Sequence, residues 1–278
     1  MKHIFWIASY PKSGNTWIRA ILSSLFFTHD GMFNFELFKN ISYFETKKNY
    51  NFVKSINNID FNNLKDIRTI SKYRLEAQKR VKIIKGDFAF FKTHGANLIV
   101  NNYKYTSEET TRGLIYIIRD PRDVVISLTN HYDKTIDEMI NFILREKNYY
   151  VSEIPHYISS WNHHYKSWLS LKVPKLVIKY ENLLNNNEEV LWNIVNFFYK
   201  NYKFKFENIE KKINNIIQST NFKKLQDHEF KFGFREARKG RFFHKGKANQ
   251  WKEILTTRQL KKVENSFKKT MKELDYIK

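Results

Sequence analysis

Short apolar runs alternate along the chain with longer segments whose apolar residues recur at helical spacing. The apolar runs have the length of buried strands, and they cover residues 3–9, 87–92, 113–119 and 175–180. The helical patterns cover residues 16–27, a stretch beginning at Pro121, and residues 156–171, 187–199 and 256–274. Strands that alternate with helices predict an α/β fold, with a central parallel sheet flanked by helices.

The segments between these elements are polar and rich in lysine and asparagine. Residues 10–15 predict a turn, residues 34–85 a mixture of helix and loop, and residues 225–250 a basic irregular stretch. No internal repeat or low-complexity linker divides the chain. With 278 residues and 42% hydrophobic content, the sequence predicts a single domain over residues 1–278.

Composition excludes several classes of protein. No apolar run approaches the roughly 20 residues that cross a bilayer. The first strand is too short, and too quickly followed by polar residues, for a signal peptide. The chain has no cysteine, which excludes disulfides, thiolate metal sites and a cysteine nucleophile. These features together predict a cytoplasmic protein.

The formal charge of +21 would attract a polyanion, such as nucleic acid, anionic lipid or a phosphorylated cofactor. Abundant lysine, asparagine and isoleucine are also expected from an A- and T-rich genome, and surface lysines are then merely solvated. Charge alone therefore leaves a basic nucleic-acid-binding protein open as an alternative. Local motifs have to decide between these functions.

The first motif is the turn between the first strand and the first helix, Tyr-Pro-Lys-Ser-Gly-Asn-Thr-Trp at residues 10–17. Main-chain N–H groups at a helix N-terminus bind anions, and Gly14 allows close approach of the backbone to a phosphate. Lys12 adds a cation and Thr16 a hydroxyl. The triphosphate loop of ATP-using enzymes has another spacing, with its lysine after the second glycine. A capped turn with a surface lysine is the simpler alternative.

Two further motifs also follow predicted strands. Arg119 ends the third strand, and Ser127 lies eight residues later, so both could bind one phosphate, unless Arg119 only pairs with a neighbouring aspartate. Lys92 and His94 follow the second strand. Carboxyl ends of parallel strands meet at one edge of a sheet, where ligands bind. We therefore expect the three motifs to serve one ligand.

These motifs resemble those of sulfotransferases that use 3′-phosphoadenosine 5′-phosphosulfate (PAPS). The usual first motif of that family is Pro-Lys-Ser-Gly-Thr-Thr-Trp, and many bacterial members have Asn in the position of Asn15. The resemblance implies a P-loop-like nucleotide-binding sulfotransferase fold. It also implies that the 5′-phosphosulfate binds residues of the first loop and that adenine stacks on its tryptophan. The loop residues concerned are Lys12, Ser13, Gly14, Asn15, Thr16 and Trp17.

The same resemblance assigns the other two motifs. Arg119 and Ser127 match the pair that binds the ribose 3′-phosphate. Lys92 and His94 match the Lys-Thr-His motif, which makes His94 the catalytic base and gives Lys92, with Lys12, the task of stabilising the transferring group. The family's Leu-Pro after the histidine is Gly-Ala here, so the acceptor pocket differs at that point.

Weaker matches lie later in the chain. Tyr180 resembles the tyrosine near adenine, and Thr220 and Phe222 resemble residues that contact the nucleoside, although ordinary packing explains each of them equally well. His244, Lys245 and Gly246 match the family's Arg-Lys-Gly motif, with histidine in the arginine position. A neutral imidazole binds phosphate less well than a guanidinium, so Arg238 or Arg241 could compensate. The dimer motif of the eukaryotic branch is not kept, and no dimer is inferred.

The resemblance predicts transfer of the sulfuryl group from PAPS to an acceptor hydroxyl or amine, with adenosine 3′,5′-bisphosphate (PAP) as the product. No metal is expected, because the sequence has no cluster of ligating residues at suitable spacing; His163 and His164 are neighbours and point apart on a helix. An ATP-dependent small-molecule kinase and a nucleic-acid-binding protein are the alternatives. The kinase predicts a triphosphate loop and a metal-binding acid, and neither is visible in the sequence. The nucleic-acid-binding protein gives no reason for three phosphate-type loops at strand ends, and no nucleic-acid partner is expected.

Overall fold

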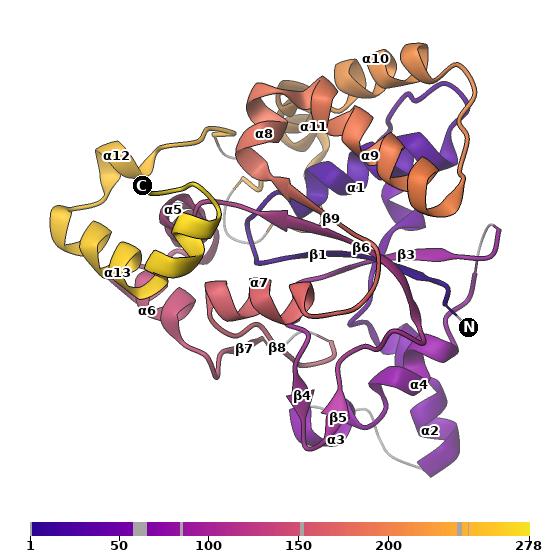
Figure 1. Ribbon diagram of the computed structural model, residues 1–278, viewed down its shortest axis with the longest axis horizontal. Helices are drawn as coiled ribbons and strands as arrows, with labels where there is room; N and C mark the ends of the chain where they lie inside the picture. Colours follow the sequence, from indigo (N-terminus) through magenta and orange to yellow (C-terminus); the bar gives the residue numbers. More distant parts are fainter. Residues whose placement is uncertain (1, 58–65, 84–85, 151–152, 238–240, 244) are drawn as a thin grey trace. The chain divides into compact units, whose positions relative to one another are not determined.

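The computed structural model describes residues 2–57, 66–83, 86–150, 153–237, 241–243 and 245–278. Its main sheet has the strand order β2-β3-β1-β6-β9 (Figure 1). These strands are β1 (Ile4–Ser9), β2 (Ser42–Tyr43), β3 (Ala89–Thr93), β6 (Thr111–Ile118) and β9 (Lys175–Lys179). β3 runs parallel to both β1 and β2. The predicted α/β class, with a parallel sheet flanked by helices, is confirmed.

The central strands are buried along their whole length. All six residues of β1 are buried, and seven of the eight residues of β6 are buried. A parallel strand covered on both faces is nearly continuously apolar, which is why these two strands were recognisable in the sequence. The register pairs Ile7 of β1 with Lys92 of β3 and Ala8 with Thr93, so the polar ends of the two strands lie side by side.

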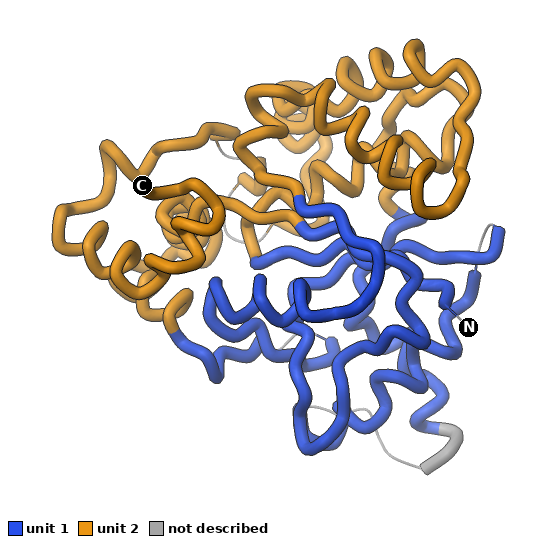
Figure 2. Tube along the Cα trace, in the orientation of Figure 1, with its two compact units in different colours: residues 1–10, 39–116, 145–177 blue, residues 11–38, 117–144, 178–278 orange. Residues whose placement is uncertain are grey.

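The chain forms two compact units, each built from three segments (Figure 2). Unit 1 contains residues 1–10, 39–116 and 145–177, and unit 2 contains residues 11–38, 117–144 and 178–278. Most of the sheet belongs to unit 1, and only the last residues of β6 and β9 belong to unit 2. That residues 1–278 act as a single domain stays a prediction.

Unit 1 surrounds its strands with short elements. They are η2 (Lys47–Tyr50), α2 (Phe52–Asn57), α3 (Ile67–Ser71), α4 (Arg74–Lys79), the antiparallel pairs β4 (Ile99–Val100) with β5 (Tyr103–Lys104) and β7 (Tyr149–Tyr150) with β8 (His156–Tyr157), and α7 (Trp161–Leu169). The helix predicted over 156–171 is correct only from residue 161, because residues 156–157 pair as β8. β2 was not predicted, since two residues carry no alternation.

Unit 2 is mostly helical. Its helices are α1 (Asn15–Phe27), α5 (Pro121–Tyr132), α6 (Ile136–Leu144), α8 (Tyr180–Asn185), α9 (Asn187–Tyr202), α10 (Ile209–Ser219), α11 (Phe222–Phe232), α12 (Trp251–Ile254) and α13 (Thr257–Glu273), while η1 (Phe35–Asn40) lies at its boundary. The irregular stretch predicted over 225–250 is wrong at its start, where α11 continues to residue 232. In the described part of the chain, no helix is both long and apolar enough to cross a bilayer.

Candidate functional site

The turn before α1 has the backbone geometry of an anion-binding loop. Gly14 is the N-cap of α1 and has a φ of 99°, and Lys12 also has a positive φ of 68°. No side chain caps the helix, so its first N–H groups are not used by a capping oxygen. A Cβ atom at Gly14 would lie 2.6 Å from Cδ2 of Tyr180. Glycine is therefore required here both by the backbone conformation and by the close approach of an aromatic ring.

Three aromatic side chains converge beside this turn. The ring of Trp17 lies 6.3 Å from that of Tyr180 and 6.4 Å from that of Phe222, with both pairs close to edge-on. A Cβ atom at Gly246 would lie 2.5 Å from Phe222, so this glycine, with its φ of 59°, also gives room to a ring. Five of the predicted nucleotide residues, from four distant parts of the sequence, are thus neighbours within unit 2.

Arg119 connects these loops. Its guanidinium donates to the main-chain oxygens of Lys12 and Lys247, at 3.1 Å each, and its Cζ atom lies 4.3 Å from the centre of the Tyr180 ring. Of the two neighbouring aspartates, Asp120 pairs with Arg122 at 2.6 Å, whereas the charge of Arg119 acts on Asp123 and opposes the rise in its pKa that burial causes. Arg119 therefore connects the first loop with the basic loop around Lys247, which we call the late loop.

Several buried polar atoms have no hydrogen-bond partner among the described residues, and two of them belong to the first loop and α1. They are the hydroxyl of Ser13, whose residue is fully buried, and Nε1 of Trp17. A buried polar group without a partner is costly, and such groups usually bind water or a ligand. A phosphate oxygen next to the α1 N-terminus could accept from Ser13, so the residues present fit a phosphorylated nucleotide.

The remaining predicted nucleotide residues are placed as follows. Ser127 is half-buried on α5, and Lys245 is exposed. Thr220 is buried and donates to the main-chain oxygen of Ile216, so its hydroxyl proton is used by α10. His244 and Arg238 lie outside the described residues. Arg241 is exposed, and its guanidinium lies 5.2 Å from the centre of the Phe230 ring.

Sequence reasoning missed the residue that anchors the late loop. The buried carboxylate of Asp123 accepts from the main-chain N–H groups of Asn249 at 2.7 Å and Trp251 at 3.1 Å. Burial raises the pKa of Asp123, and the nearby Arg119 opposes this rise. Asp123 follows Arg119 by four residues, and its place in the first turn of a buried helix was the available signal. It holds residues 249–251 against α5.

The predicted catalytic histidine lies in unit 1, directly after β3. Nδ1 of His94 is 2.9 Å from the main-chain oxygen of Ser9 and 3.3 Å from its hydroxyl. A carbonyl oxygen only accepts, so Nδ1 carries a proton, and in the neutral ring Nε2 then carries the lone pair. Lys92 is buried, and its ammonium lies 5.3 Å from the centre of the Tyr43 ring. This tautomer suits a base acting through Nε2.

A buried carboxylate stabilises the Lys-Thr-His segment at residues 92–94 through Thr93. Glu45, which is fully buried, accepts from the hydroxyls of Thr93, at 2.8 Å, and Tyr105. The Thr93 hydroxyl in turn accepts from the main-chain N–H of Gly95 at 2.8 Å. The sequence singled out Lys92 and His94 but not this support, because Glu45 comes from a segment without recognisable periodicity.

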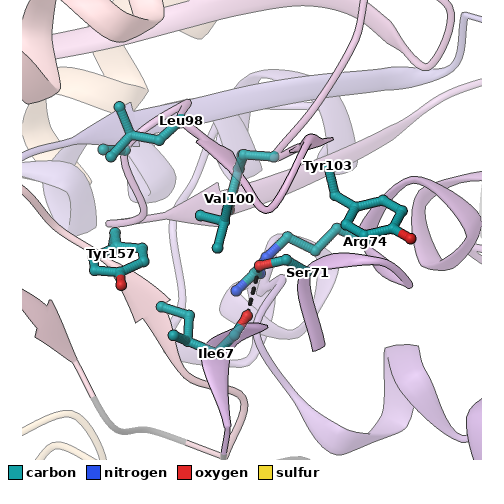
Figure 3. Close-up of a pocket in the computed structure, with 9 residues that line it drawn as sticks. Ile67, Ser71, Arg74, Leu98, Val100, Tyr103 and Tyr157 are labelled. Carbon is teal, nitrogen blue, oxygen red and sulfur yellow. Dashed lines mark hydrogen bonds between the residues drawn. The ribbon is translucent and has the colours of Figure 1, made fainter. Parts of the chain in front are cut away.

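Unit 1 also has a small pocket beside Ala96, shown in Figure 3. Its empty volume is about 230 Å³, and it is lined by Ile67, Ser71, Arg74, Ala96, Leu98, Val100, Tyr103, Tyr105 and Tyr157. Ligand sites are usually about 300–1,000 Å³. Ser71 donates to the main-chain oxygen of Ile67 at 2.6 Å, so its hydroxyl proton is not available to a ligand. This pocket is too small for a nucleotide, and it contains none of the predicted site residues.

No group of three or more histidines and carboxylates that could hold a metal occurs in the described ranges. The Lys12 ammonium lies 4.0 Å from the centre of the Phe242 ring, and both residues belong to unit 2. The described residues predicted to bind the nucleotide thus belong to unit 2, while Lys92 and His94 belong to unit 1.

Comparison with known proteins matches residues 2–275 to the sulfotransferase domain family. Mouse sulfotransferase SULT7A1, crystallised with PAP, aligns with 99% of this chain and 85% of its own, at a TM-score of 0.59 and 19% identity. Retinol dehydratase with androsterone and the inactive cofactor PAP aligns with 97% of this chain and 80% of its own, at a TM-score of 0.63 and 20% identity. The curated protein sequences contain no match. These structures establish the fold.

Proposed function

Since the chain belongs to the sulfotransferase family, we propose that it transfers the sulfuryl group of PAPS to an acceptor hydroxyl or amine and releases PAP. One observation carries this proposal. An aromatic cluster beside the N-terminus of α1 is formed by Trp17, Tyr180 and Phe222. Gly14 and Gly246 leave room for the rings of Tyr180 and Phe222. An adenine ring stacks on aromatic side chains, and its phosphates suit the helix N-terminus.

The proposal gives unit 2 the task of binding the nucleotide. Main-chain N–H groups and hydroxyls of residues 13–16 hold the 5′-phosphate, and Trp17 stacks on adenine. Arg119 and Ser127 hold the 3′-phosphate together with Lys245, which lies two residues before Lys247, the residue whose carbonyl accepts from Arg119. Support for the Arg119 assignment comes from its guanidinium, which lies at the junction of the first and late loops rather than in a salt bridge with Asp120.

The proposal gives His94 the task of accepting the acceptor's proton at Nε2 as the acceptor oxygen or nitrogen bonds to sulfur. The bond between sulfur and the bridging oxygen breaks, and that oxygen leaves on PAP. Lys12 and Lys92 stabilise the charge that develops on the sulfuryl and leaving oxygens. Support comes from the Nδ1–H tautomer of His94, because proton acceptance requires a neutral imidazole with its lone pair on the reacting side.

The test is a transfer assay with PAPS and a panel of small phenols, alcohols and amines, in which PAP release is measured by anion-exchange chromatography. The proposal predicts acceptor-dependent PAP release and no phosphate transfer from ATP to the same panel. Phosphate transfer from ATP without release of PAP from PAPS would contradict it and favour the kinase alternative.

A further inference from the structure

Two adjacent histidines on α7 have different surroundings. His163 is partly exposed, and its Nδ1 lies 3.1 Å from the hydroxyl of Ser159. His164 is fully buried, and both of its ring nitrogens have partners: Nδ1 lies 2.7 Å from the Tyr116 hydroxyl, and Nε2 lies 3.2 Å from the main-chain oxygen of His94. Only the second histidine therefore reaches the residue to which we assign the proton transfer.

The chemistry of these partners determines the protonation of His164. The carbonyl oxygen of His94 can only accept, so Nε2 of His164 carries a proton. Burial lowers the pKa of His164 to about 3, so the ring is neutral and Nδ1 accepts from the Tyr116 hydroxyl. The imidazole is thus a fixed donor to the main chain of His94 throughout the neutral pH range.

These contacts form a closed hydrogen-bonded ring that includes both the main chain and the side chain of His94. The main-chain N–H of Tyr10 hydrogen-bonds the Tyr116 hydroxyl, which donates to His164, which donates to the carbonyl of His94. The His94 side chain donates from Nδ1 to the carbonyl of Ser9, in the same peptide unit as the Tyr10 N–H. One peptide unit at the end of β1 therefore fixes both the backbone and the imidazole of His94. All members of the ring belong to unit 1.

Neighbouring contacts restrain the same loop. Trp168, four residues after His164 on α7, donates from Nε1 to the carbonyl of Gly95 at 2.8 Å. The main-chain N–H of Asn97 donates to the hydroxyl of Ser167, also on α7, at 3.0 Å. Polar side chains of α7 thus serve the backbone that follows β3, although a helix packed on a sheet would ordinarily present apolar residues there.

We propose that His164 is a positioning residue for sulfuryl transfer: as a neutral donor, it holds the backbone of His94 so that the His94 imidazole keeps its proton on Nδ1 and accepts at Nε2. This inference rests on the proposed function, because it assumes that His94 is the base. The physical reason is that the rate of the transfer step falls by roughly 100-fold when the base is displaced by about 1 Å.

The experiment uses the full chain labelled with ¹⁵N-histidine and records long-range ¹H–¹⁵N spectra, which distinguish the two imidazole tautomers without any acceptor. The wild type is expected to show His94 as the Nδ1–H tautomer and His164 as the Nε2–H tautomer. His164→Leu removes the donor and is expected to leave His94 as a mixture of tautomers. His164→Gln keeps an N–H donor of similar reach and should restore the single His94 tautomer. His163→Leu, the matched neighbour, should change nothing at His94.

Turnover of PAPS with the panel of phenols, alcohols and amines is measured on the same variants. We expect His164→Leu to lower kcat by roughly 10- to 100-fold while PAP affinity is unchanged, and His164→Gln to recover most of the rate. A folded His164→Leu protein with a single His94 Nδ1–H tautomer and normal kcat overturns the proposal. If His164→Leu does not fold, Tyr116→Phe is used in its place. This variant removes the donor to Nδ1 of His164 and is expected to give a mixture of His94 tautomers. An unchanged His94 spectrum in Tyr116→Phe overturns the proposal equally.

His94→Ala separates the two proposals. Normal transfer by His94→Ala means that the base assignment is wrong. Loss of transfer in His94→Ala together with normal transfer in His164→Leu means that only the positioning role of His164 is wrong.

Discussion

Nδ1 of His94 lies 2.9 Å from the main-chain oxygen of Ser9, the last residue of β1. β1 leads directly into the nucleotide-type loop, and His94 follows the neighbouring strand β3. The parallel pairing of the two strands brings their ends together, with Ala8 opposite Thr93. A single peptide at the end of β1 therefore fixes the tautomer of a histidine more than 80 residues away in sequence.

The first prediction concerns this histidine. His94→Ala removes the group that accepts the acceptor's proton, and kcat for sulfuryl transfer should fall by about 10²- to 10⁴-fold, the usual contribution of general base catalysis. PAP binds residues of unit 2 in the proposed function, so its dissociation constant should stay within about twofold of wild type. Transfer at the wild-type rate would show that another group takes the proton.

A second prediction tests the first loop. Gly14→Ala places a Cβ 2.6 Å from Tyr180 at a residue with a φ of 99°. The backbone strain alone costs about 1–3 kcal/mol, and the ring must also move. Both the free energy of unfolding, measured with urea, and the affinity for PAP should decrease.

Gly233→Ala is the control for strain. Gly233 has a φ of 74°, but no atom lies within 4 Å of an added Cβ. It should therefore lower stability without changing PAP affinity. Equal losses of PAP affinity in both variants would show that the contact between Gly14 and Tyr180 has no role in binding.

A third prediction concerns acid. The pKa of His164 is lowered by burial to about 3, whereas an unfolded histidine titrates near 6.5. Between these values the unfolded chain binds a proton that the folded chain does not, so the free energy of unfolding should fall as the pH is lowered from about 6.5 toward 3. The slope from this group reaches about 1.4 kcal/mol per pH unit.

His164→Gln removes this titration, and its stability should depend less steeply on pH over the same window. His156 is a second buried histidine whose pKa is lowered by burial, so some acid sensitivity should remain. Urea unfolding of both proteins at several pH values measures the difference. Identical slopes would mean that His164 is not neutral in the folded protein.

Much of this architecture was predictable from local sequence. β1 and β6 are buried on both faces and read as continuous apolar runs, and Pro121 marks the first turn of α5. The first loop was predictable because its glycine and its lysine stand at the junction of a strand and a helix. The α/β class followed from the alternation of these elements.

What the sequence did not predict depends on distant packing. Glu45 and Asp123 are buried carboxylates that bind main-chain or hydroxyl groups far away in sequence, and no local spacing reveals such partners. α11 was missed because lysines interrupt its apolar positions. His163 and His164 are adjacent letters, and only the fold shows that one is a partly exposed side chain and the other a buried donor.

The central claim is that unit 2 binds a nucleotide with a 3′-phosphate. Calorimetric titration with PAP, AMP and ATP, on the wild type and on Arg119→Ala, tests it directly. We expect PAP to bind the wild type at micromolar concentration and well ahead of AMP and ATP. In Arg119→Ala, PAP should bind about 10- to 100-fold more weakly, as expected for the loss of a charge-assisted contact, and it should lose more affinity than AMP, which has no 3′-phosphate. Equal affinities of the wild type for PAP, AMP and ATP would contradict the account.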